Sequence, residues 1–479
     1  MEPVRYLVVS DLHLGALNSV LTNVADSGTA VDREAASPAL SALGACLASL
    51  TARSVPPELV VLGDLFELAL TPLDDAAATF AHFARALGLG TPGGAVARQL
   101  RFVAGNHDHH MWTRARMEHD ARIVRETPRG QPLQQPEHVT AMFDDPAAPP
   151  VRARFIEALV EWSSDGASIE AVHSYPNFGL VDGSGERAIV MHHGHFVEHL
   201  YRIVSSLDDL FGDPSRGRSA SELERENAGW IDFFWSSEGD SGDAGMDVRV
   251  LYESLVSGRT IDAEINRASR LLGRGRRGFV ARLERYVATR LALRAHHTLA
   301  QRERHHSQAV LSRDADTGLE MYLGGPVRNE LDSALGHVPA DATFLFGHTH
   351  KPFVATRGVT GYPRPVTLVN TGGWVVDHPE PEPLKGATAV LIDADLRTVA
   401  LELYRQRADG TVAPPAAVAV GSVSVPWAEA VRARMAADQS AWAGLTTALD
   451  EAVAARRRQL LERDAATEAR IARANARPG

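Results

Sequence analysis

The chain has 479 residues, more than one hydrophobic core usually serves, so we expect one large domain with inserted or appended segments. Hydrophobic residues at 44% and charged residues at 23% are typical of a globular protein, and no apolar run is long enough to cross a bilayer. The formal charge of −11 does not favour a large nucleic-acid-binding surface. Cys46 is the single cysteine, which excludes an internal disulfide and a cysteine-rich metal cluster.

The first third of the chain alternates short apolar strands with helical patterns. We predict strands at Arg5–Ser10, Glu58–Leu62 and Leu100–Ala104, each followed by a polar loop. Thr71 and Pro72 look like a helix N-cap followed by proline at the first helical position, and Gly88 ends that helix. This βαβ order indicates an α/β fold. Further apolar strands are predicted at residues 188–191, 343–346, 366–369 and 387–392.

The organisation of the chain changes in the middle and again near the end. Residues 199–337 carry charged helical patterns, and strands of the first kind resume after them, so we interpret this region as an inserted helical cap. Trp230, Phe233, Phe234 and Trp235 fit one helical face, and we expect them in the core of the cap rather than at a ligand. The predicted domains are therefore a core of residues 1–198 and 338–410, the cap, and a helical C-terminal extension of residues 411–479.

Three polar clusters follow the three predicted N-terminal strands. Asp11 and His13 come directly after the first strand, and Asp64, which follows a glycine, comes after the second. The third strand is followed by Asn106, a neutral oxygen ligand, and by His107 and Asp108. We expect His107 to act as a general acid and Asp108 to fix its tautomer. Clusters at consecutive strand ends predict one shared crevice.

Two histidine clusters repeat the same arrangement later in the chain. His192, His193 and His195 follow the strand that ends at residue 191, and His348 and His350 follow the strand that ends at residue 346. A single polar loop is ordinary, but five in this order are hard to attribute to chance. Since the chain offers no cysteine ligand set, the metal ligands would be nitrogen and oxygen atoms.

At this point the sequence resembles the calcineurin-like metallophosphoesterases, whose ordered blocks are Asp-x-His, Gly-Asp-x-x-Asp, Gly-Asn-His-Asp/Glu, His and Gly-His-x-His. The resemblance covers about residues 1–195 and 342–404 and does not extend to the cap or the tail. It implies a four-layer α/β/β/α sandwich, to which the residue patterns add a large helical insertion and a helical C-terminal tail. By motif, Asp11, His13 and His350 would bind one metal ion, Asn106, His193 and His348 the other, and Asp64 would bridge the two.

Two positions depart from the family pattern or leave it ambiguous. Glu67 stands where a second aspartate is usual, which puts the orientation of the ligands in question more than metal binding itself. His193 is chosen as the fourth-block ligand because it stands next to a glycine. His195 is left with two interpretations, a residue near substrate or a polar residue without a binding role.

The resemblance implies a hydrolase that uses two divalent ions, with manganese, iron or zinc fitting the mixed ligands best. A hydroxide bridging the ions would attack phosphorus, and His107 would protonate the leaving oxygen. We expect a phosphodiesterase or phosphomonoesterase of unknown substrate, in the cytoplasm because no secretory signal precedes the first strand. The sequence does not indicate the oligomeric state.

Alternative functions remain within and outside this class. Residues 63–67 and 370–374 look similar to the UDP-2,3-diacylglucosamine pyrophosphohydrolases, but that branch carries arginine at the position of His107 and has shorter chains. A catalytically silent scaffold would have lost ligands, whereas each ligand position is filled here. A nuclease would need a basic groove interleaved with aromatic residues, so nucleic acid is not favoured.

Overall fold

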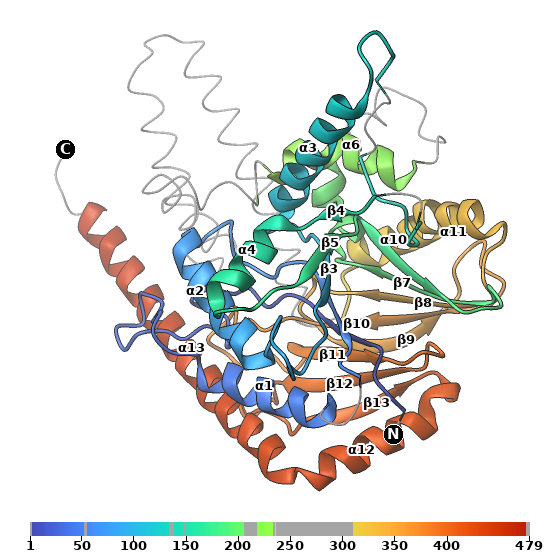
Figure 1. Ribbon diagram of the computed structural model, residues 1–479. Helices are drawn as coiled ribbons and strands as arrows, with labels where there is room; N and C mark the ends of the chain where they lie inside the picture. The colour runs from blue at the N-terminus through green and yellow to red at the C-terminus, as the bar shows by residue number, and fades with distance from the viewer. Residues whose placement is uncertain are drawn as a thin grey trace, which may run out of the picture.

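The computed structural model describes residues 2–51, 55–133, 138–146, 149–205, 218–232, 235 and 310–475 (Figure 1). Most of the predicted cap, including Phe233 and Phe234, lies outside these residues. Within the described ranges, no helix has both the length and the apolar character that a membrane span requires. The fold is a mixed α/β structure built on two mixed sheets, one of eight strands and one of five.

The eight-stranded sheet has the order β13-β12-β11-β1-β2-β3-β5-β4. Strands β1, β2, β3 and β5 run parallel, and antiparallel strands extend the sheet on both sides. Its strands are β1 (Tyr6–Val9), β2 (Glu58–Leu62), β3 (Gln99–Val103), β4 (Val151–Arg152), β5 (Glu170–His173), β11 (Gly386–Ile392), β12 (Thr398–Arg405) and β13 (Ala416–Val420).

The five-stranded sheet has the order β6-β7-β8-β10-β9, with β7, β8 and β10 parallel and an antiparallel strand at each edge. Its strands are β6 (Asn177–Val181), β7 (Arg187–His192), β8 (Asp341–Phe346), β9 (Phe353–Arg357) and β10 (Val366–Asn370). Apolar residues occupy most positions of its central strands, as expected for strands buried on both faces.

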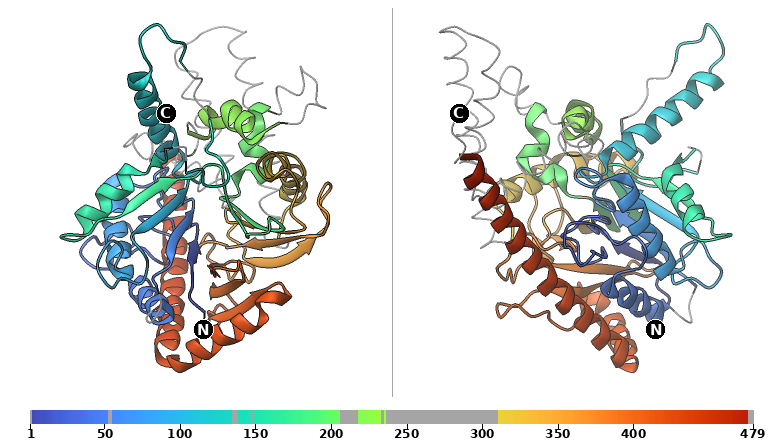
Figure 2. Two further views of the ribbon diagram at one scale, coloured as in Figure 1. Left: turned by 45° about the vertical axis from the view of Figure 1, so that its right-hand side comes forward. Right: turned by 90° about the vertical axis from the view of Figure 1, so that its left-hand side faces the viewer.

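The two sheets pack face to face through a shared apolar layer, formed by Val8, Val60, Leu62 and Val103 of one sheet and Ile189, Met191, Leu345 and Val369 of the other. Helices cover the outer face of the eight-stranded sheet: α1 (Pro38–Thr51), α2 (Leu73–Leu87), α4 (Arg154–Ser163), α12 (Val425–Ala437) and α13 (Gln439–Asn475) (Figure 2). The single cysteine, Cys46, is buried among them, and burial raises its pKa to about 12. It is a core residue.

Described parts of the predicted cap cover the outer face of the five-stranded sheet. These are the short helix η2 (His199–Arg202), α6 (Ala220–Ile231), α10 (Arg313–Tyr322), the π-helical turn η5 (Leu323–Val327) and α11 (Arg328–Leu335), and the short helix η1 (His195–Val197) of the predicted core lies directly before them. Helix α3 (His109–Glu126) buries only its first turn, where His109 contacts Glu224 of α6, and then extends away from the sheets (Figure 1).

Sequence and structure agree on the strands that lead to the polar clusters, with differences at two elements. Helix α2 begins at Leu73, and Pro72 rather than Thr71 is its N-cap, because the extended ψ of 143° at Pro72 keeps that residue outside the helix. The region from residue 411 was predicted to be helical, whereas it begins with β13. Its alternating valines pair with β12 at the sheet edge before α12 starts.

Candidate metal centre

Polar loops follow the carboxyl ends of parallel strands in both sheets and meet at one place. Neighbouring parallel strands lead into these loops, β1, β2 and β3 in one sheet and β7, β8 and β10 in the other. Such strand ends are where α/β proteins bind ligands. Short contacts across the loops bring together all seven residues predicted as metal ligands: Asp11, His13, Asp64, Asn106, His193, His348 and His350.

Asp11, His13 and His350 form the first ligand group. The Nε2 atoms of His13 and His350 are 3.2 Å apart, and His350 Nε2 is 3.5 Å from Asp11 Oδ1. Asp11 and His13 are buried, and the carboxylate of Asp11 also accepts the backbone N–H of His348 at 2.9 Å. A carboxylate and two ring nitrogens at these separations can hold a metal ion.

Asp64, Asn106, His193 and His348 form the second group. His193 Nε2 is 3.0 Å from Asn106 Oδ1 and 3.2 Å from His348 Nδ1. Asp64 Oδ2 is 3.5 Å from His193 Nε2 and 3.6 Å from His13 Nε2. The carboxylate of Asp64 therefore stands between the two groups. Burial would raise its pKa, but the surrounding histidines lower it to about 2.

His13 and His193 each make a hydrogen bond through the ring nitrogen that points away from the centre. That bond determines whether the other ring nitrogen offers a lone pair or an N–H group to the centre. His13 Nδ1 is 3.0 Å from Glu67 Oε2, and His193 Nδ1 is 2.8 Å from the carbonyl oxygen of Leu62. A neutral ring that donates through Nδ1 has a lone pair at Nε2. The two Nε2 lone pairs thus meet the oxygens of Asp64 and Asn106, an assembly of acceptors that a cation stabilises.

Two further carboxylates orient the other ligand histidines. His348 Nε2 is 3.4 Å from Glu198 Oε2, and His350 Nδ1 is 3.6 Å from Asp377 Oδ2. The Nζ atom of Lys385 is 3.0 Å from the same Asp377 oxygen. Burial would raise the pKa of Asp377, yet Lys385 and His350 hold it well below its ordinary value. Sequence reasoning missed both carboxylates, which fix the orientation of their rings.

Glu67 links His107 to the first ligand group. Its Oε1 atom is 2.7 Å from His107 Nδ1, while its Oε2 atom contacts His13. Burial would lower the pKa of His107, but the carboxylates of Glu67 and Asp64 raise it to about 10. His107 is therefore positively charged near neutral pH and can donate to negative charge that develops beside it. Glu67 therefore orients both rings, so the presence of glutamate where aspartate was expected does not leave these rings without a carboxylate partner.

The prediction that Asp108 fixes the tautomer of His107 is wrong, because Glu67 makes that contact. The carboxylate of Asp108 instead accepts backbone N–H groups at 2.7 Å from Gly105 and 2.8 Å from Leu65, with longer contacts from the residues on either side of Leu65. Burial and the charge of Asp64 raise the pKa of Asp108 to about 7. Asp108 holds two loops together and does not reach the ring of His107.

The geometry supports the choice of His193 from the run of three histidines. His192 is buried in an apolar layer, and neither of its ring nitrogens has a hydrogen-bond partner among the described residues. Burial keeps its pKa well below the ordinary value, so it is neutral. His195 lies behind His193, with Nε2 3.1 Å from the hydroxyl of Tyr175, which donates to Glu224 at 3.0 Å. His195 is thus linked to α6.

The backbone is strained at the candidate ligands. In the described chain, five of the six non-glycine residues with positive φ are candidate ligands: Asp11 (50°), His13 (45°), Asp64 (49°), His348 (70°) and His350 (55°). This conformation costs about 1 kcal/mol or more per residue and persists where surrounding structure enforces it, often at functional sites. A side chain at Gly347 would overlap the carboxylate of Asp11, so glycine there permits the close approach of the loops.

Aromatic residues of the insertion cover the centre. The ring of Tyr201 contacts His348 edge-on, with centroids 5.0 Å apart, and the ring of Trp235 lies 5.6 Å from that of His107. Both aromatic side chains are buried. Trp235 was predicted to belong to the core of the cap, and it does lie in that apolar cluster, but it also reaches the centre. Sequence reasoning gave no signal for Tyr201.

Comparisons with known proteins identified no relative of this chain. No protein-family model matches the chain, and no curated protein matches it. The geometry itself therefore carries the interpretation: buried groups of histidine and carboxylate side chains, brought together from the loops of two sheets, can hold metal ions.

Proposed function

We propose that the chain is a phosphoester hydrolase of the calcineurin-like metallophosphoesterase type that uses two divalent metal ions. The observation that carries the proposal is the position of Asp64, whose Oδ2 atom lies 3.5 and 3.6 Å from ring nitrogens of the two ligand groups. Helices on the outer faces of two stacked sheets are also the layers of a four-layer α/β/β/α sandwich. Both features support the proposal independently.

The donor set fits two ions. Asp11, His13 and His350 would hold the first, Asn106, His193 and His348 the second, and Asp64 would contact both. Imidazole, carboxylate and amide ligands suit manganese, iron or zinc. When bound, the ions would supply an activated water and would neutralise charge on a phosphoryl group.

The protein's own residues perform the remaining tasks. Glu67 holds His107 in its protonated form, and the ring donates a proton to the leaving oxygen. The backbone N–H of His107 donates to Asp64 Oδ1 at 2.9 Å and so holds that carboxylate in place. Tyr201 and Trp235 exclude water from the centre, which strengthens each charge interaction there.

Residues 370–374, one of the two segments that suggested the pyrophosphohydrolase alternative, make backbone contacts that do not bear on the substrate. Asn370 donates from Nδ2 to the carbonyl of Gly347 at 2.9 Å and accepts the N–H of Gly372 at 2.8 Å. These bonds give the segment a role in supporting the loop of His348 and His350. A general phosphodiesterase or phosphomonoesterase is therefore the first proposal.

The test is hydrolysis of bis-p-nitrophenyl phosphate and p-nitrophenyl phosphate by metal-stripped protein with manganese, iron, zinc or nickel added back. We expect turnover only with metal, and the ratio of the two rates separates a diesterase from a monoesterase. Asp64→Asn keeps the shape of the side chain but removes its charge and should lower turnover by at least about 100-fold.

Asp341→Asn is the matched control, because Asp341 is a partly exposed carboxylate at the other end of β8, paired with Arg187. It should leave turnover unchanged. Equal rates in Asp64→Asn and the unmodified protein would contradict the proposal. Two bound ions per chain without turnover of either ester would favour a silent scaffold.

A further inference from the structure

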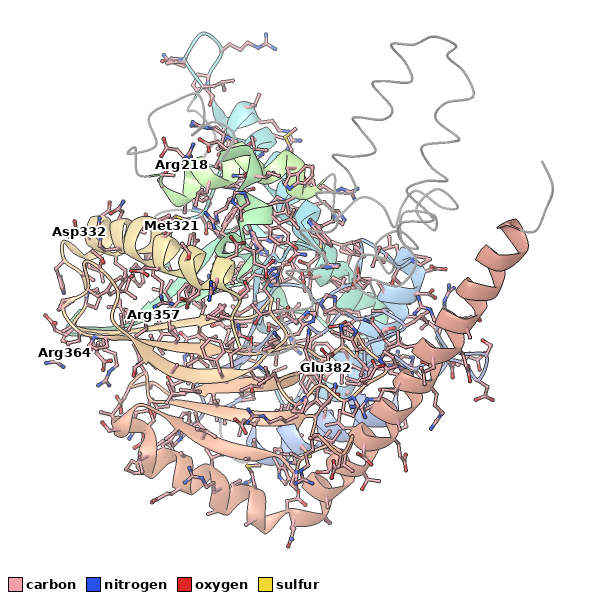
Figure 3. The ribbon with its side chains drawn as sticks, turned by 180° about the vertical axis from the view of Figure 1, so that it is seen from behind. Arg218, Met321, Asp332, Arg357, Arg364 and Glu382 are labelled. Carbon is pink, nitrogen blue, oxygen red and sulfur yellow. The ribbon has the colours of Figure 1, made fainter. Side chains whose placement is uncertain are left out.

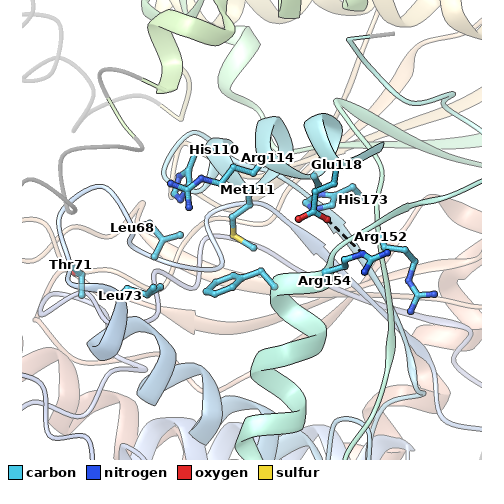
Figure 4. Close-up of a pocket in the computed structure, with 12 residues that line it drawn as sticks. Leu68, Thr71, Leu73, His110, Met111, Arg114, Glu118, Arg152, Arg154 and His173 are labelled. Atoms are coloured by element: carbon cyan, nitrogen blue, oxygen red, sulfur yellow. Dashed lines mark ion pairs between the residues drawn. The ribbon is translucent and has the colours of Figure 1, made fainter. Parts of the chain in front are cut away.

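A pocket of about 270 Å³ lies between the segment before α2, the first turns of α3 and the first turn of α4 (Figure 4). Leu68 and Met111 are buried in its wall, only 7% and 6% exposed. Leu73 and Phe155 also line it and are much more open, 47% and 38% exposed. The pocket thus has an apolar wall and apolar side chains that remain accessible to solvent.

Charged side chains also line the pocket, those of Arg114, Arg152 and Arg154 together with Glu118. Arg152 is already bonded, because Glu157 Oε1 accepts from its Nη2 atom at 2.6 Å and from its Nε atom at 2.8 Å. Arg154 Nε is 3.6 Å from Glu118 Oε2, and both side chains are more than half exposed, so this pair is weak. A ligand anion can therefore compete for Arg154.

A buried polar atom in the lining has no partner. His173 is 4% exposed, lies against Phe102 and Trp112, and its Nδ1 atom has no hydrogen-bond partner within the part of the chain that the structure describes. Burial lowers the pKa of His173 to about 3, so the ring is neutral. His173 therefore adds a buried, neutral ring to the lining and no charge.

We propose that this pocket binds a small amphipathic anion, a sulfonate, phosphate or carboxylate attached to an aromatic ring or a short aliphatic chain. The anion would face Arg154, and the apolar part would cover Leu68, Met111 and Phe155. The volume suits a ring or short chain and is small for a diacyl lipid. The inference concerns binding alone and does not depend on the proposed hydrolysis.

Equilibrium dialysis with naphthalene-1-sulfonate tests the proposal, because dialysis counts bound molecules directly. The full chain should bind one molecule with a Kd below about 1 mM. Naphthalene-1-methanol, which lacks the charge, and inorganic sulfate, which lacks the ring, should each bind at least about tenfold more weakly. We expect the same Kd for naphthalene-1-sulfonate in the presence of EDTA, which would show that the anion does not bind to a metal ion.

Two substitutions that are expected to change the affinity in opposite directions test the location of the site. Arg154→Gln should weaken binding of the sulfonate about tenfold, whereas Glu118→Gln, which removes the lining carboxylate, should tighten it about threefold. Arg364→Gln is the matched control, since this exposed arginine lies at the outer end of the five-stranded sheet (Figure 3). Absence of bound probe, equal binding of all three probes, or equal effects of the Arg154 and Arg364 substitutions would overturn the proposal.

Discussion

Two imidazole rings share the carboxylate of Glu67, one oxygen contacting each ring. In Glu67→Gln the carboxamide can accept from only one N–H and turns its own NH₂ toward the other ring. One histidine must then change tautomer or rotate. We expect metal affinity to fall by about 10- to 100-fold, as for other carboxylates that support ligand histidines.

Competition with a metallochromic indicator measures this affinity. Glu186→Gln serves as the control because Glu186 is exposed and precedes β7, at the end of that strand opposite His193. Unchanged affinity in Glu67→Gln would mean that this carboxylate does not orient His13 as a ligand.

Asp108 is a second residue whose role is set by what its oxygens accept. An asparagine has only one acceptor oxygen and would place its NH₂ against backbone N–H groups of Leu65 or Gly105. Asp108→Asn should therefore lower the free energy of unfolding by about 2–3 kcal/mol. Denaturation in guanidinium chloride at pH 8, above the pKa of about 7, is the measurement. A change under about 0.5 kcal/mol would contradict this role.

At the residue scale, the sequence predicts the ligands better than their supports. Asp11, Asp64 and His193 follow strand ends, and strand ends are recognisable from apolar runs. Glu198 and Asp377 reach their histidines only through tertiary packing, at separations that no local pattern encodes. The error over Asp108 has the same origin, because sequence proximity to His107 suggested a contact that the folded loop does not make.

Among the elements, α6 is attached to the core by a buried ion-pair network. His109 Nε2 is 3.1 Å from Glu224 Oε1, and His109 Nδ1 is 2.7 Å from Asp232 Oδ1. Burial would lower the pKa of His109, but these carboxylates raise it to about 10. Glu224→Gln leaves the buried imidazolium with only one carboxylate and should lower the free energy of unfolding by about 3 kcal/mol.

The sign of the pH dependence follows from the raised pKa of His109. Its stabilising contribution is complete below the ordinary value of 6.5 and is lost as pH rises through about 10. The difference in unfolding free energy between the unmodified protein and Glu224→Gln should therefore be largest near pH 6 and narrow toward pH 10. A difference that grows with pH would refute this assignment, and Glu320→Gln, at an exposed position of α10, is the control.

Strands were predicted correctly where a continuous apolar run dominated the local sequence. The apolar run Glu58–Leu62 is β2 at the same bounds, because a strand buried on both faces needs continuous apolar residues. The edge strands β9 and β13 are short and partly exposed, so their composition resembles that of loops and helices. Pairing with a neighbouring strand, rather than the local sequence, determines such strands.

For the whole molecule, α13 connects the C-terminal region to the N-terminal loop. Arg456 is 5% exposed and donates from Nε to the carbonyl of Ser19 at 3.1 Å and from Nη2 to that of Thr22 at 2.6 Å. Arg456→Met keeps much of the apolar stem but leaves both carbonyls without this partner. We expect a loss of about 2–3 kcal/mol in unfolding free energy.

Thermal and denaturant unfolding would measure that loss. Arg458→Met is the matched control, since Arg458 lies on the exposed face of the same helix. Equal stability of the two variants would show that α13 packs through its apolar residues alone. Trp442, Leu445 and Leu449 also join the main core, a contact that the prediction of a helical extension did not specify.

The position of Lys385, which is paired with Asp377, has a consequence for chemical labelling. The chain has only two lysines, Lys351 and Lys385, against 47 arginines. Lys351 directly follows a candidate ligand and is 4% exposed, while Lys385 holds Asp377 behind His350. Acylation by an amine-selective reagent would thus be confined, apart from the terminal amine, to the surroundings of one ligand histidine. Mass spectrometry of the acylated lysines would report on that side of the centre without any substitution in the chain.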